Sequence, residues 1–398
     1  MATVAEIQPR LLMGPGPSDV HPRVLAAMAH PTVGHLDAQF LTILNDVRGM
    51  LQGVFQTRNP LTLAVSGTGS AGMETCVVNL IEPGDKMLVC IAGVFGQRMK
   101  DVAERAGAKV TAIDVPWGQV FSADQVQAAL REHGPFKLVG IVHAETSTGA
   151  GQPIPAISQV VHQAGAMLLV DTVTSLAGME VDVDGWQIDA CYSGTQKCLS
   201  CPPGLAPVTF SPAAEKVIAG RGSKCQSWYL DMNMVRQYWG SERLYHHTAP
   251  INMIYALHEA LRIVLEEGLL ERWKRHRLHH LALKAGLEAM GLTFLAEADH
   301  QLPMLNAVAV PEGVDEASTR RRLLAESAIE IGAGLGAFKG KAWRIGLMGQ
   351  SATQKHVKAA LSAIETLLVE QKAIRSAGLS LPAANRIYAG SAPSLSKL

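Results

Sequence analysis

Apolar residues recur along this chain at two different spacings. From Asp37 to Phe55 they follow the interval of a helix. Beyond that helix, short apolar runs rich in β-branched residues alternate with helical stretches, and the runs lie at Leu61–Val65, Met87–Ala92, Val110–Val115, Leu138–His143, Met167–Asp171 and Ala206–Phe210. This alternation predicts an α/β fold, in which a mostly parallel sheet carries helices on both faces.

The pattern changes again in the last third of the chain. Helical spacing runs from Tyr255 to Leu287, and beyond it strands at 305–310, 329–331 and 343–345 alternate with helices at 316–326 and 353–368. This predicts a second, smaller α+β domain. We therefore expect four parts: an N-terminal arm with two Gly-Pro pairs (1–20), a large domain (21–265), a small C-terminal domain (266–372) and a disordered tail rich in Ala, Ser, Gly and Pro (373–398).

Composition places the chain among ordinary globular proteins. Of its 398 residues, 48% are hydrophobic and 18% are charged, and the 35 basic and 35 acidic residues cancel. The zero net charge argues against nucleic acid as a partner. Six scattered cysteines suit a reducing interior better than a disulfide scaffold. Because the chain has neither a signal-peptide pattern nor an apolar run of about 18 residues, we expect a soluble protein that is neither secreted nor membrane-bound.

Asp171 and Lys197 are the first candidates for chemistry. Asp171 ends the predicted strand Met167–Asp171, and ligands of parallel sheets bind at the carboxyl ends of strands. Lys197 ends the segment Tyr192-Ser193-Gly194-Thr195-Gln196-Lys197. A lysine amine can form a Schiff base with pyridoxal phosphate, and a carboxylate can keep the ring nitrogen of that cofactor protonated. Each residue alone is much more often a surface lysine or a helix-capping aspartate, so only the flanking motifs favour the chemical role.

The segment Ser66-Gly67-Thr68-Gly69-Ser70 follows a predicted strand and opens a helix. Glycines allow close approach to a phosphate, and the hydroxyls and the helix N-terminus attract its charge. The segment lacks the lysine of an ATP-binding loop. Phe95, just beyond the second strand, could stack on a planar ring or pack in the core. The hydroxyls of Glu145-Thr146-Ser147-Thr148-Gly149 could bond a ring oxygen or cap the turn.

Taken together, these motifs resemble a known family. The segments that carry the resemblance, in chain order, are Gly14-Pro15-Gly16-Pro17, Gln56-Thr57-Arg58-Asn59-Pro60-Leu61-Thr62, Ser66 to Gly69, Glu145 to Gly149, Gln196-Lys197, Tyr245-His246-His247-Thr248 and Trp343-Arg344-Ile345-Gly346. They are similar to class V (fold type I) aminotransferases that depend on pyridoxal phosphate, most of all to alanine-glyoxylate and serine-pyruvate aminotransferases. The resemblance runs from Leu11 to about Leu368. It implies the transfer of an amino group from alanine or serine to glyoxylate or pyruvate, in ping-pong fashion.

The resemblance also implies roles for individual residues. Lys197 would form the Schiff base, Asp171 would face the ring nitrogen, and Arg344 would bind the substrate carboxylate. The other cofactor-binding residues would be Thr68, Gly69, Ser70, Phe95, Ser147, Val173 and Gln196, joined across a homodimer interface by Tyr245 and Thr248 of the neighbouring subunit. Two positions depart from the family pattern, because Ser70 and Phe95 stand where some relatives have histidine and tryptophan.

Other functions remain to be weighed against this one. A cysteine desulfurase needs a mobile cysteine late in the chain, and no cysteine follows Cys225. An inactive scaffold would have no need of Lys197, Asp171 and Arg344 together. Transamination between ureidoglycine and glyoxylate, a reaction of purine breakdown, is the nearest alternative, and sequence does not separate it from the first.

Three further signals concern metals and cellular address. Cys198 and Cys201 have the spacing of a metal pair but lack a second pair. His276, His279 and His280 share a helical face with several basic residues, which favours a solvated basic face over a zinc site, so we expect no metal. The final residues Ser396-Lys397-Leu398 match the tripeptide that the peroxisomal import receptor binds. We therefore expect a peroxisomal protein, or a cytoplasmic one if the source is bacterial.

Overall fold

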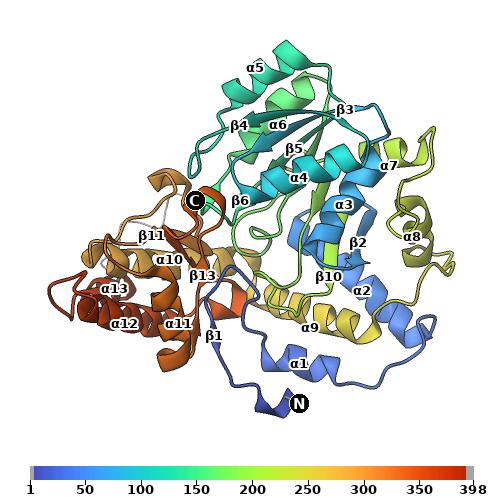
Figure 1. Cartoon of the computed structure of the whole chain (residues 1–398). Helices are drawn as coiled ribbons and strands as arrows, with labels where there is room; N and C mark the ends of the chain where they lie inside the picture. Colours follow the sequence, from blue (N-terminus) through green and yellow to red (C-terminus); the bar gives the residue numbers. More distant parts are fainter. Residues whose placement is uncertain (1–3, 391–398) are drawn as a thin grey trace.

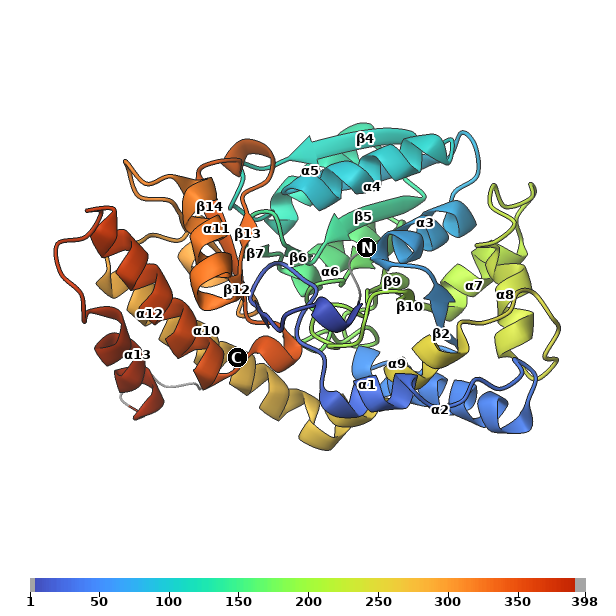
Figure 2. The same ribbon diagram turned by 60° about the horizontal axis from the view of Figure 1, so that its bottom comes forward.

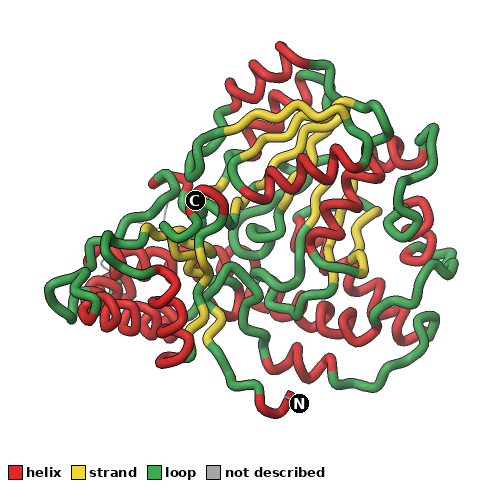
Figure 3. The backbone as a smooth tube through the Cα atoms, in the orientation of Figure 1, coloured by secondary structure: helices red, strands yellow, loops and turns green. Residues whose placement is uncertain are grey.

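A seven-stranded sheet forms the centre of the larger part of the molecule (Figures 1 and 3). The computed structural model describes residues 4–390. The strand order is β2 (Leu61–Ser66), β10 (Leu205–Phe210), β9 (Ala190–Tyr192), β8 (Met167–Asp171), β5 (Leu138–Val142), β3 (Lys86–Ile91) and β4 (Lys109–Asp114). Only β10 runs antiparallel to its neighbours in this sheet, so the prediction of a mostly parallel α/β fold is confirmed. The short strand β9 is the one that the apolar pattern missed.

Helices cover both faces of this sheet. On one face lie α3 (Gly69–Leu80) and α4 (Val94–Arg105), and on the other lie α5 (Ala123–His133) and α6 (Ile154–Gln163), as expected for right-handed crossovers that run in opposite directions along the sheet. Further helices are α1 (Pro22–Met28), α2 (Ala38–Phe55), α7 (Pro212–Ala219), α8 (Met232–Trp239) and α9 (Ile251–Glu267). The small hairpin of β6 (Ala144–Glu145) and β7 (Ala150–Gly151) follows β5.

The amphipathic pattern of α2 explains its position. The helix begins after Asp37, whose carboxylate accepts a hydrogen bond from the Gln39 amide at 2.8 Å. Its apolar residues at helical spacing, including Phe40, Leu44 and Leu51, are fully buried in the main core. The helix therefore forms where the sequence predicts it, because one face has apolar surface to bury.

A second core lies in the C-terminal part of the chain. Its three-stranded antiparallel sheet has the order β11 (Leu305–Ala309), β14 (Ala342–Gly346) and β13 (Gly332–Ala333). The helices of this part are α10 (Leu269–Ala289), α11 (Glu316–Ser327) and α12 (Gln354–Glu370). Trp343 is fully buried there, and its indole N–H donates to the Glu316 carbonyl at 3.3 Å.

The N-terminal arm belongs to this second core in part. β1 (Leu11–Leu12) pairs in parallel with β12 (Ile329–Glu330). Met13 is fully buried in the second core, and its carbonyl accepts from the Gly346 amide at 2.7 Å. Figures 1 and 2 show the arm between the small sheet and the large one. Residues far apart in sequence thus meet along the arm.

The expectation of a disordered tail is wrong for much of residues 373–390. They contain the helix α13 (Ser380–Tyr388), which packs against α10. Small side chains allow this close packing, since Ala383 and Ala384 are buried, and the Tyr388 hydroxyl lies 2.9 Å from His279 Nδ1. Composition suggested disorder, but a short helix with a face of small residues packs against α10 and buries that face. The tripeptide Ser396-Lys397-Leu398 lies outside the described residues, and its role stays a prediction.

Two further observations concern membrane-spanning helices and the state of the cysteines. Within them, no helix is both long and apolar enough to span a bilayer. The six cysteines carry free thiols, and all of them except Cys225 are buried.

We predict that Glu365 holds α13 in place. Its buried carboxylate accepts from the amides of Leu379 and Ser380, at 2.6 and 3.1 Å, and from the Ser380 hydroxyl. In Glu365→Ala these donors lose their acceptor, which costs about 1–3 kcal/mol for each buried group left unpaired. Trypsin should then cleave faster after Arg386 within α13. In the control Glu370→Ala, which removes an exposed carboxylate from the same helix, the cleavage rate should stay unchanged. Equal rates for both variants would contradict this role.

Candidate active site

The carboxyl ends of several strands of the large sheet border one cavity of about 160 Å³. Asp171 ends β8, and Lys197 lies in the turn between β9 and β10. The structure brings together around this cavity eight of the residues that the sequence predicted: Thr68, Gly69, Ser70, Phe95, Asp171, Val173, Gln196 and Lys197.

The Asp171 carboxylate is buried and held by two hydrogen bonds. Its Oδ2 accepts from the Tyr192 hydroxyl at 2.7 Å, and its Oδ1 accepts from the Val173 amide at 2.8 Å. Burial raises the pKa of Asp171 to about 6, while the hydrogen bonds from Tyr192 and Val173 and the Lys197 charge act in the opposite direction. The carboxylate is therefore still mainly ionised at neutral pH, and it can stabilise a cation in the cavity.

The Lys197 amine is buried and donates to the carbonyl oxygen of Pro15 in the N-terminal arm. Burial, together with the nearby positive charge of Arg344, lowers the pKa of Lys197 to about 8. A substantial fraction of the amine is thus unprotonated near neutral pH, the form that attacks a carbonyl carbon. Gly16 makes room for this side chain, because a Cβ there would lie 2.7 Å from Lys197 Cδ, and its φ of +98° also favours glycine.

The N-terminus of α3 forms the wall where a phosphate was expected. Thr68 is the N-cap of α3, and its side chain makes no capping hydrogen bond with any described residue. Gly69 packs so tightly that a Cβ would lie 3.1 Å from Val173 Cγ2. Ser70 accepts from Arg98 Nη1 at 3.3 Å. The amide oxygen of Gln196 is buried without a hydrogen-bond partner in the described part of the chain. The hydroxyls of Thr68 and Ser70 and the helix dipole of α3 are therefore available to an anion at this wall.

Glu145 and Ser147 lie next to the cavity rather than in its lining. Ser147 Oγ donates to Glu145 Oε1 at 2.5 Å, and Glu145 Oε2 accepts from the amides of Phe95 and Gly96 at the start of α4. Burial raises the pKa of Glu145, against the effect of these hydrogen bonds. Gly93 is needed for the close approach, since a Cβ there would lie 2.6 Å from Glu145 Cγ. The lining residue of this loop is Thr146, and the predicted contact between Ser147 and the cofactor stays a prediction.

Arg344 reaches this region from β14 of the small sheet. Its Nε donates to the Ala333 carbonyl at 2.6 Å, and its Nη1 lies 3.4 Å from the carbonyl of Thr146. Burial lowers the pKa of Arg344 to about 10, against the effect of the Glu145 charge. Arg344 thus contacts a residue of the cavity wall although it is not itself a lining residue.

Tyr245 and Thr248 lie outside the lining of the Lys197 cavity. Both are exposed, Tyr245 by 64%, and neither is among the residues that line the Lys197 cavity. The Tyr245 ring is 5.2 Å from the ring of His35. Their predicted role across a subunit interface stays a prediction.

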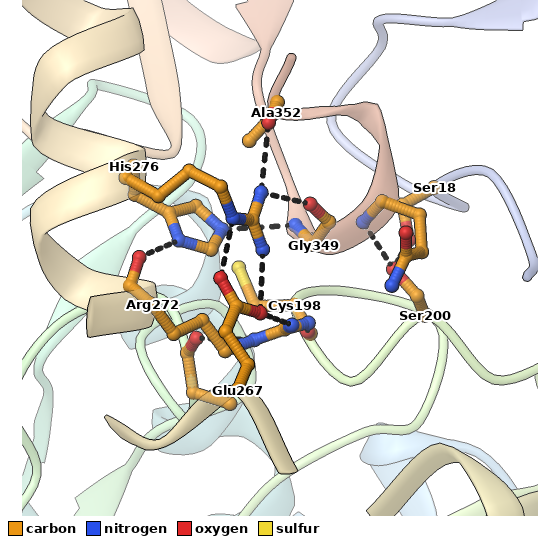
Figure 4. A network of polar contacts seen from close by, with 11 residues as sticks. Ser18, Cys198, Ser200, Glu267, Arg272, His276, Gly349 and Ala352 are labelled. Carbon is orange, nitrogen blue, oxygen red and sulfur yellow. Dashed lines mark hydrogen bonds and ion pairs between the residues drawn. The ribbon is translucent and has the colours of Figure 1, made fainter. Parts of the chain in front are cut away.

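A buried polar network holds the turn that contains Lys197 (Figure 4). Ser18 Oγ donates to the Lys197 carbonyl at 2.7 Å and lies 2.9 Å from Ser200 Oγ. Arg272 Nη2 donates to the Cys198 carbonyl at 2.6 Å. Glu267 forms an ion pair with Arg272. This pair neutralises the buried Arg272 guanidinium, which at the same time holds the Lys197 turn.

The same network corrects the expectation for the histidines of α10. Arg272 and His276 are fully buried, and His279 and His280 are nearly so, so the prediction of a solvated basic face is wrong. His276 Nε2 accepts from the Gly349 amide at 2.9 Å, and Nδ1 faces the Arg272 carbonyl at 2.7 Å. Burial lowers the pKa of His276 well below its usual value, consistent with a neutral ring that donates from Nδ1. Among the described residues, no group of histidine, cysteine and acidic side chains is arranged to hold a metal ion.

Tyr192 and Arg98 are polar lining residues that the sequence did not identify as part of the site. Tyr192 stands in β9, which is too short to show a strand pattern, although it begins the segment that leads to Lys197. Arg98 closes the segment Gly93 to Arg98, and its guanidinium lies 4.9 Å from the centre of the Phe95 ring. The only sequence signal for Tyr192 was its place in the segment that ends at Lys197, and for Arg98 its closeness to Phe95.

The sequence is similar to that of several known aminotransferases. Residues 15–360 match the family model described as aminotransferase class-V. The chain is 41% identical to a (S)-ureidoglycine--glyoxylate transaminase of Bacillus subtilis over 95% of both chains. It is 39% identical to an alanine--glyoxylate aminotransferase of Felis catus, over 90% of this chain and 87% of the relative.

Two crystal structures are close to the whole fold. An alanine--glyoxylate aminotransferase from Nostoc sp. superposes with a TM-score of 0.91 at 48% identity, over 92% of this chain and 97% of the other. The ureidoglycine-glyoxylate aminotransferase of Bacillus subtilis superposes with a TM-score of 0.94 at 42% identity, over 96% and 99%. The fold type I architecture expected from the resemblance is therefore confirmed, and the chain belongs to the class V aminotransferases, within their alanine-glyoxylate aminotransferase-like family.

Proposed function

We propose that this enzyme transfers the amino group of a small amino acid, alanine or serine, to glyoxylate or pyruvate. One observation carries the proposal: a buried lysine amine, with a pKa lowered to about 8, lines the same cavity as a buried carboxylate and the N-terminus of a helix. The class V family implies pyridoxal phosphate, and these three features match its aldehyde, its ring nitrogen and its phosphate.

The residues fit this cofactor by their chemistry. Asp171 would hold a proton on the ring nitrogen, and Phe95 and Val173 would enclose the ring. The hydroxyls of Thr68 and Ser70, the Gly69 amide and the Gln196 side chain would bind the phosphate. The uncapped start of α3, whose first backbone N–H groups point along the helix dipole, is the observation that supports this placement. When bound, the cofactor supplies the carbonyl carbon that accepts the amino group and a ring that withdraws electrons.

The chain's own groups would then bind the substrate and move its protons. Arg344 would orient a substrate by its carboxylate, which suits a planar guanidinium already held in place by the Ala333 carbonyl. Lys197 Nζ would take the proton from the substrate Cα and deliver it to the former carbonyl carbon of the cofactor, on the other side of the amino nitrogen, because burial keeps part of the amine uncharged.

A second candidate donor is ureidoglycine. The similarity to the Bacillus subtilis ureidoglycine--glyoxylate enzyme, at 41% identity and a TM-score of 0.94, favours it. We therefore propose glyoxylate as the shared acceptor and leave two donor classes to be compared. Purified holoenzyme should be assayed with glyoxylate against alanine, serine and ureidoglycine. A kcat/KM for alanine or serine above that for ureidoglycine supports the first proposal, and the reverse order replaces it with the second.

We also propose a homodimer in which Tyr245 and Thr248 reach the cofactor phosphate of the neighbouring subunit. Their exposure, and the fact that neither lines the chain's own cavity, support this arrangement. Two exposed apolar residues lie near Tyr245. Leu244 precedes it in the sequence, and Trp228 stacks on the His246 ring of the same loop.

We predict that Lys197→Ala abolishes transamination and leaves the fold intact. The Lys197 amine donates to one loop carbonyl, whereas the turn is held by backbone contacts with Ser18 and Arg272 that the substitution retains. Activity with the preferred donor and glyoxylate, and the circular dichroism spectrum, are the two measurements. The matched control is Lys274→Ala, at a partly exposed lysine of α10 paired with Glu271, which should keep full activity. Parent-like turnover by Lys197→Ala would remove the basis of the proposal.

Arg344→Lys should reduce kcat/KM for both the amino donor and the oxo acid. A bidentate charge-assisted pair becomes a contact with a point charge, at a cost of about 2 kcal/mol, which corresponds to roughly 30-fold in kcat/KM. The effect should appear mainly in KM, because ground-state binding is lost. Arg321→Lys, at an exposed position on α11, serves as the control. If steady-state kinetics show the same KM for Arg344→Lys and the parent, another residue binds the carboxylate.

A further inference from the structure

Glu145 is a buried carboxylate to which the proposed mechanism gives no task. It is 0% exposed, and both of its oxygens accept hydrogen bonds. Oε2 accepts from the amides of Phe95 and Gly96 at 3.2 and 3.3 Å. Oε1 accepts from the Ser147 amide at 3.1 Å and from the Ser147 hydroxyl at 2.5 Å. Three of these four partners are backbone N–H groups, which can only donate, so an ionised carboxylate suits the position.

These contacts cap the helix α4 from a distant part of the sequence. The first N–H groups of a helix have no partner within the helix. In α4 they belong to Val94, Phe95 and Gly96. The Val94 amide donates to Ser147 Oγ at 3.0 Å, and the other two amides donate to Glu145. The negative charge of Glu145 also interacts favourably with the dipole of α4 at this end.

Gly93 shows why the cap comes from elsewhere. It is the N-cap residue of α4, and it supplies no side-chain hydrogen bond. A Cβ at this position would lie 2.3 Å from Ser147 Oγ and 2.6 Å from Glu145 Cγ. The residue types that usually cap a helix, Ser, Thr, Asp and Asn, therefore cannot stand here while Glu145 and Ser147 hold their places. The start of α4 and the turn 145–149 fit each other only in this combination.

The main chain of Glu145 is fixed as well. Glu145 ends β6 and pairs with Ala150 of β7 in the small hairpin. Its carbonyl accepts from the amides of Thr148 and Gly149 at 3.2 and 2.9 Å. Because the backbone is held in this way, the side chain couples the position of the hairpin to the start of α4. Without the carboxylate, buried N–H groups would lose their acceptor and the start of α4 would have to move.

The cap joins two parts of the wall of the Lys197 cavity. Phe95, whose amide donates to Glu145, lines the cavity. Thr146, which follows Glu145 directly, lines it as well, and its carbonyl lies 3.4 Å from Arg344 Nη1. Burial lowers the pKa of Arg344 to about 10, and the Glu145 charge acts in the opposite direction. One carboxylate therefore connects the aromatic wall, the turn and the arginine.

We propose that Glu145 is a positioning residue for the reaction: together with Ser147 it caps α4, and it thereby fixes Phe95 against the cofactor ring and Thr146 beside Arg344. The inference rests on the proposed function, because it takes the Lys197 cavity to hold pyridoxal phosphate. Glu145 does not itself line this cavity, so it acts through the residues that it binds. The role gives a physical reason for burying a charge here, since the charge meets four donors and a helix dipole.

The test compares Glu145→Ala and Glu145→Gln with the matched control Glu365→Ala. Glu365 is also a buried carboxylate that accepts from two amides at the start of a helix, α13, and it does not line the Lys197 cavity. Hydrogen–deuterium exchange of the apoenzymes is measured in peptides that span 93–99 and 379–386. Each apoenzyme is then titrated with pyridoxal phosphate. The absorbance of the bound cofactor gives its Kd, and its circular dichroism band reports how the ring is held.

We expect the 93–99 peptide to exchange faster in Glu145→Ala than in the parent. The Kd for pyridoxal phosphate should rise by about tenfold or more, because three buried N–H groups lose their acceptor. Glu145→Gln should show a smaller change in the same direction, since an amide keeps one acceptor oxygen. The circular dichroism band should change in both variants. Glu365→Ala should exchange faster only in the 379–386 peptide and should keep the Kd and the band of the parent.

A Kd and a circular dichroism band like those of the parent in both Glu145 variants would overturn the positioning role, even with faster exchange at 93–99, because the cap would then be structural only. An equal rise in Kd in Glu365→Ala would overturn it too, since a general loss of stability would explain the effect. If Glu145→Ala does not fold, Glu145→Gln decides alone. A parent protein that binds no pyridoxal phosphate would refute the proposed function and this inference with it, whereas a parent that binds normally beside unaffected variants refutes the inference alone.

Discussion

The amine of Lys197 is buried close to the positive charge of Arg344, and the rest of the site depends on this unfavourable pairing of like charges. Burial and Arg344 both disfavour the ammonium form, while Asp171 favours it. The result is a pKa of about 8, close enough to neutral pH for the amine to exist in both forms. Asp171 shows the converse effect, because burial raises its pKa to about 6 and Tyr192 stabilises its ionised form. A proton can therefore be exchanged inside the cavity at small energetic cost.

This balance requires that segments far apart in sequence stay in place. Asp171 and Tyr192 are adjacent in the sheet because β8 and β9 run parallel and pair in register. Pro15 comes from the arm, which is fixed by its pairing with β12, and Arg344 comes from the central strand of the small sheet. Because Ser18 and Arg272 also bind the carbonyls of the Lys197 turn, a shift of the arm or of α10 would move the amine itself.

The helix α10 lies beside the Lys197 turn and also lines a second cavity. Its buried polar side chains, Arg272 and His276, face the Lys197 turn and the loop at Gly349 (Figure 4). Another side of the same helix, with Trp273 and Arg277, lines that cavity of about 440 Å³. A helix with polar groups buried on more than one side has no simple amphipathic pattern, which explains why its sequence suggested a solvated surface. Polar groups are buried here because specific acceptors and counter-charges exist for most of them.

The sequence by itself determined the strands of the large sheet except the short β9, the helices between them and the residues at the strand ends. Apolar periodicity is local, so β8 with Asp171 and the helix start at Gly69 could be predicted within a residue or two. Family motifs added Lys197 and Arg344, which no periodicity would have identified. Only the tertiary structure decided that Tyr192 supports Asp171, that Ser147 lies next to the cavity lining rather than in it, that the α10 histidines are buried and that residues 380–388 form a helix. Each of these depends on which distant surface a segment meets, and burial by a distant partner has no signature in the local sequence.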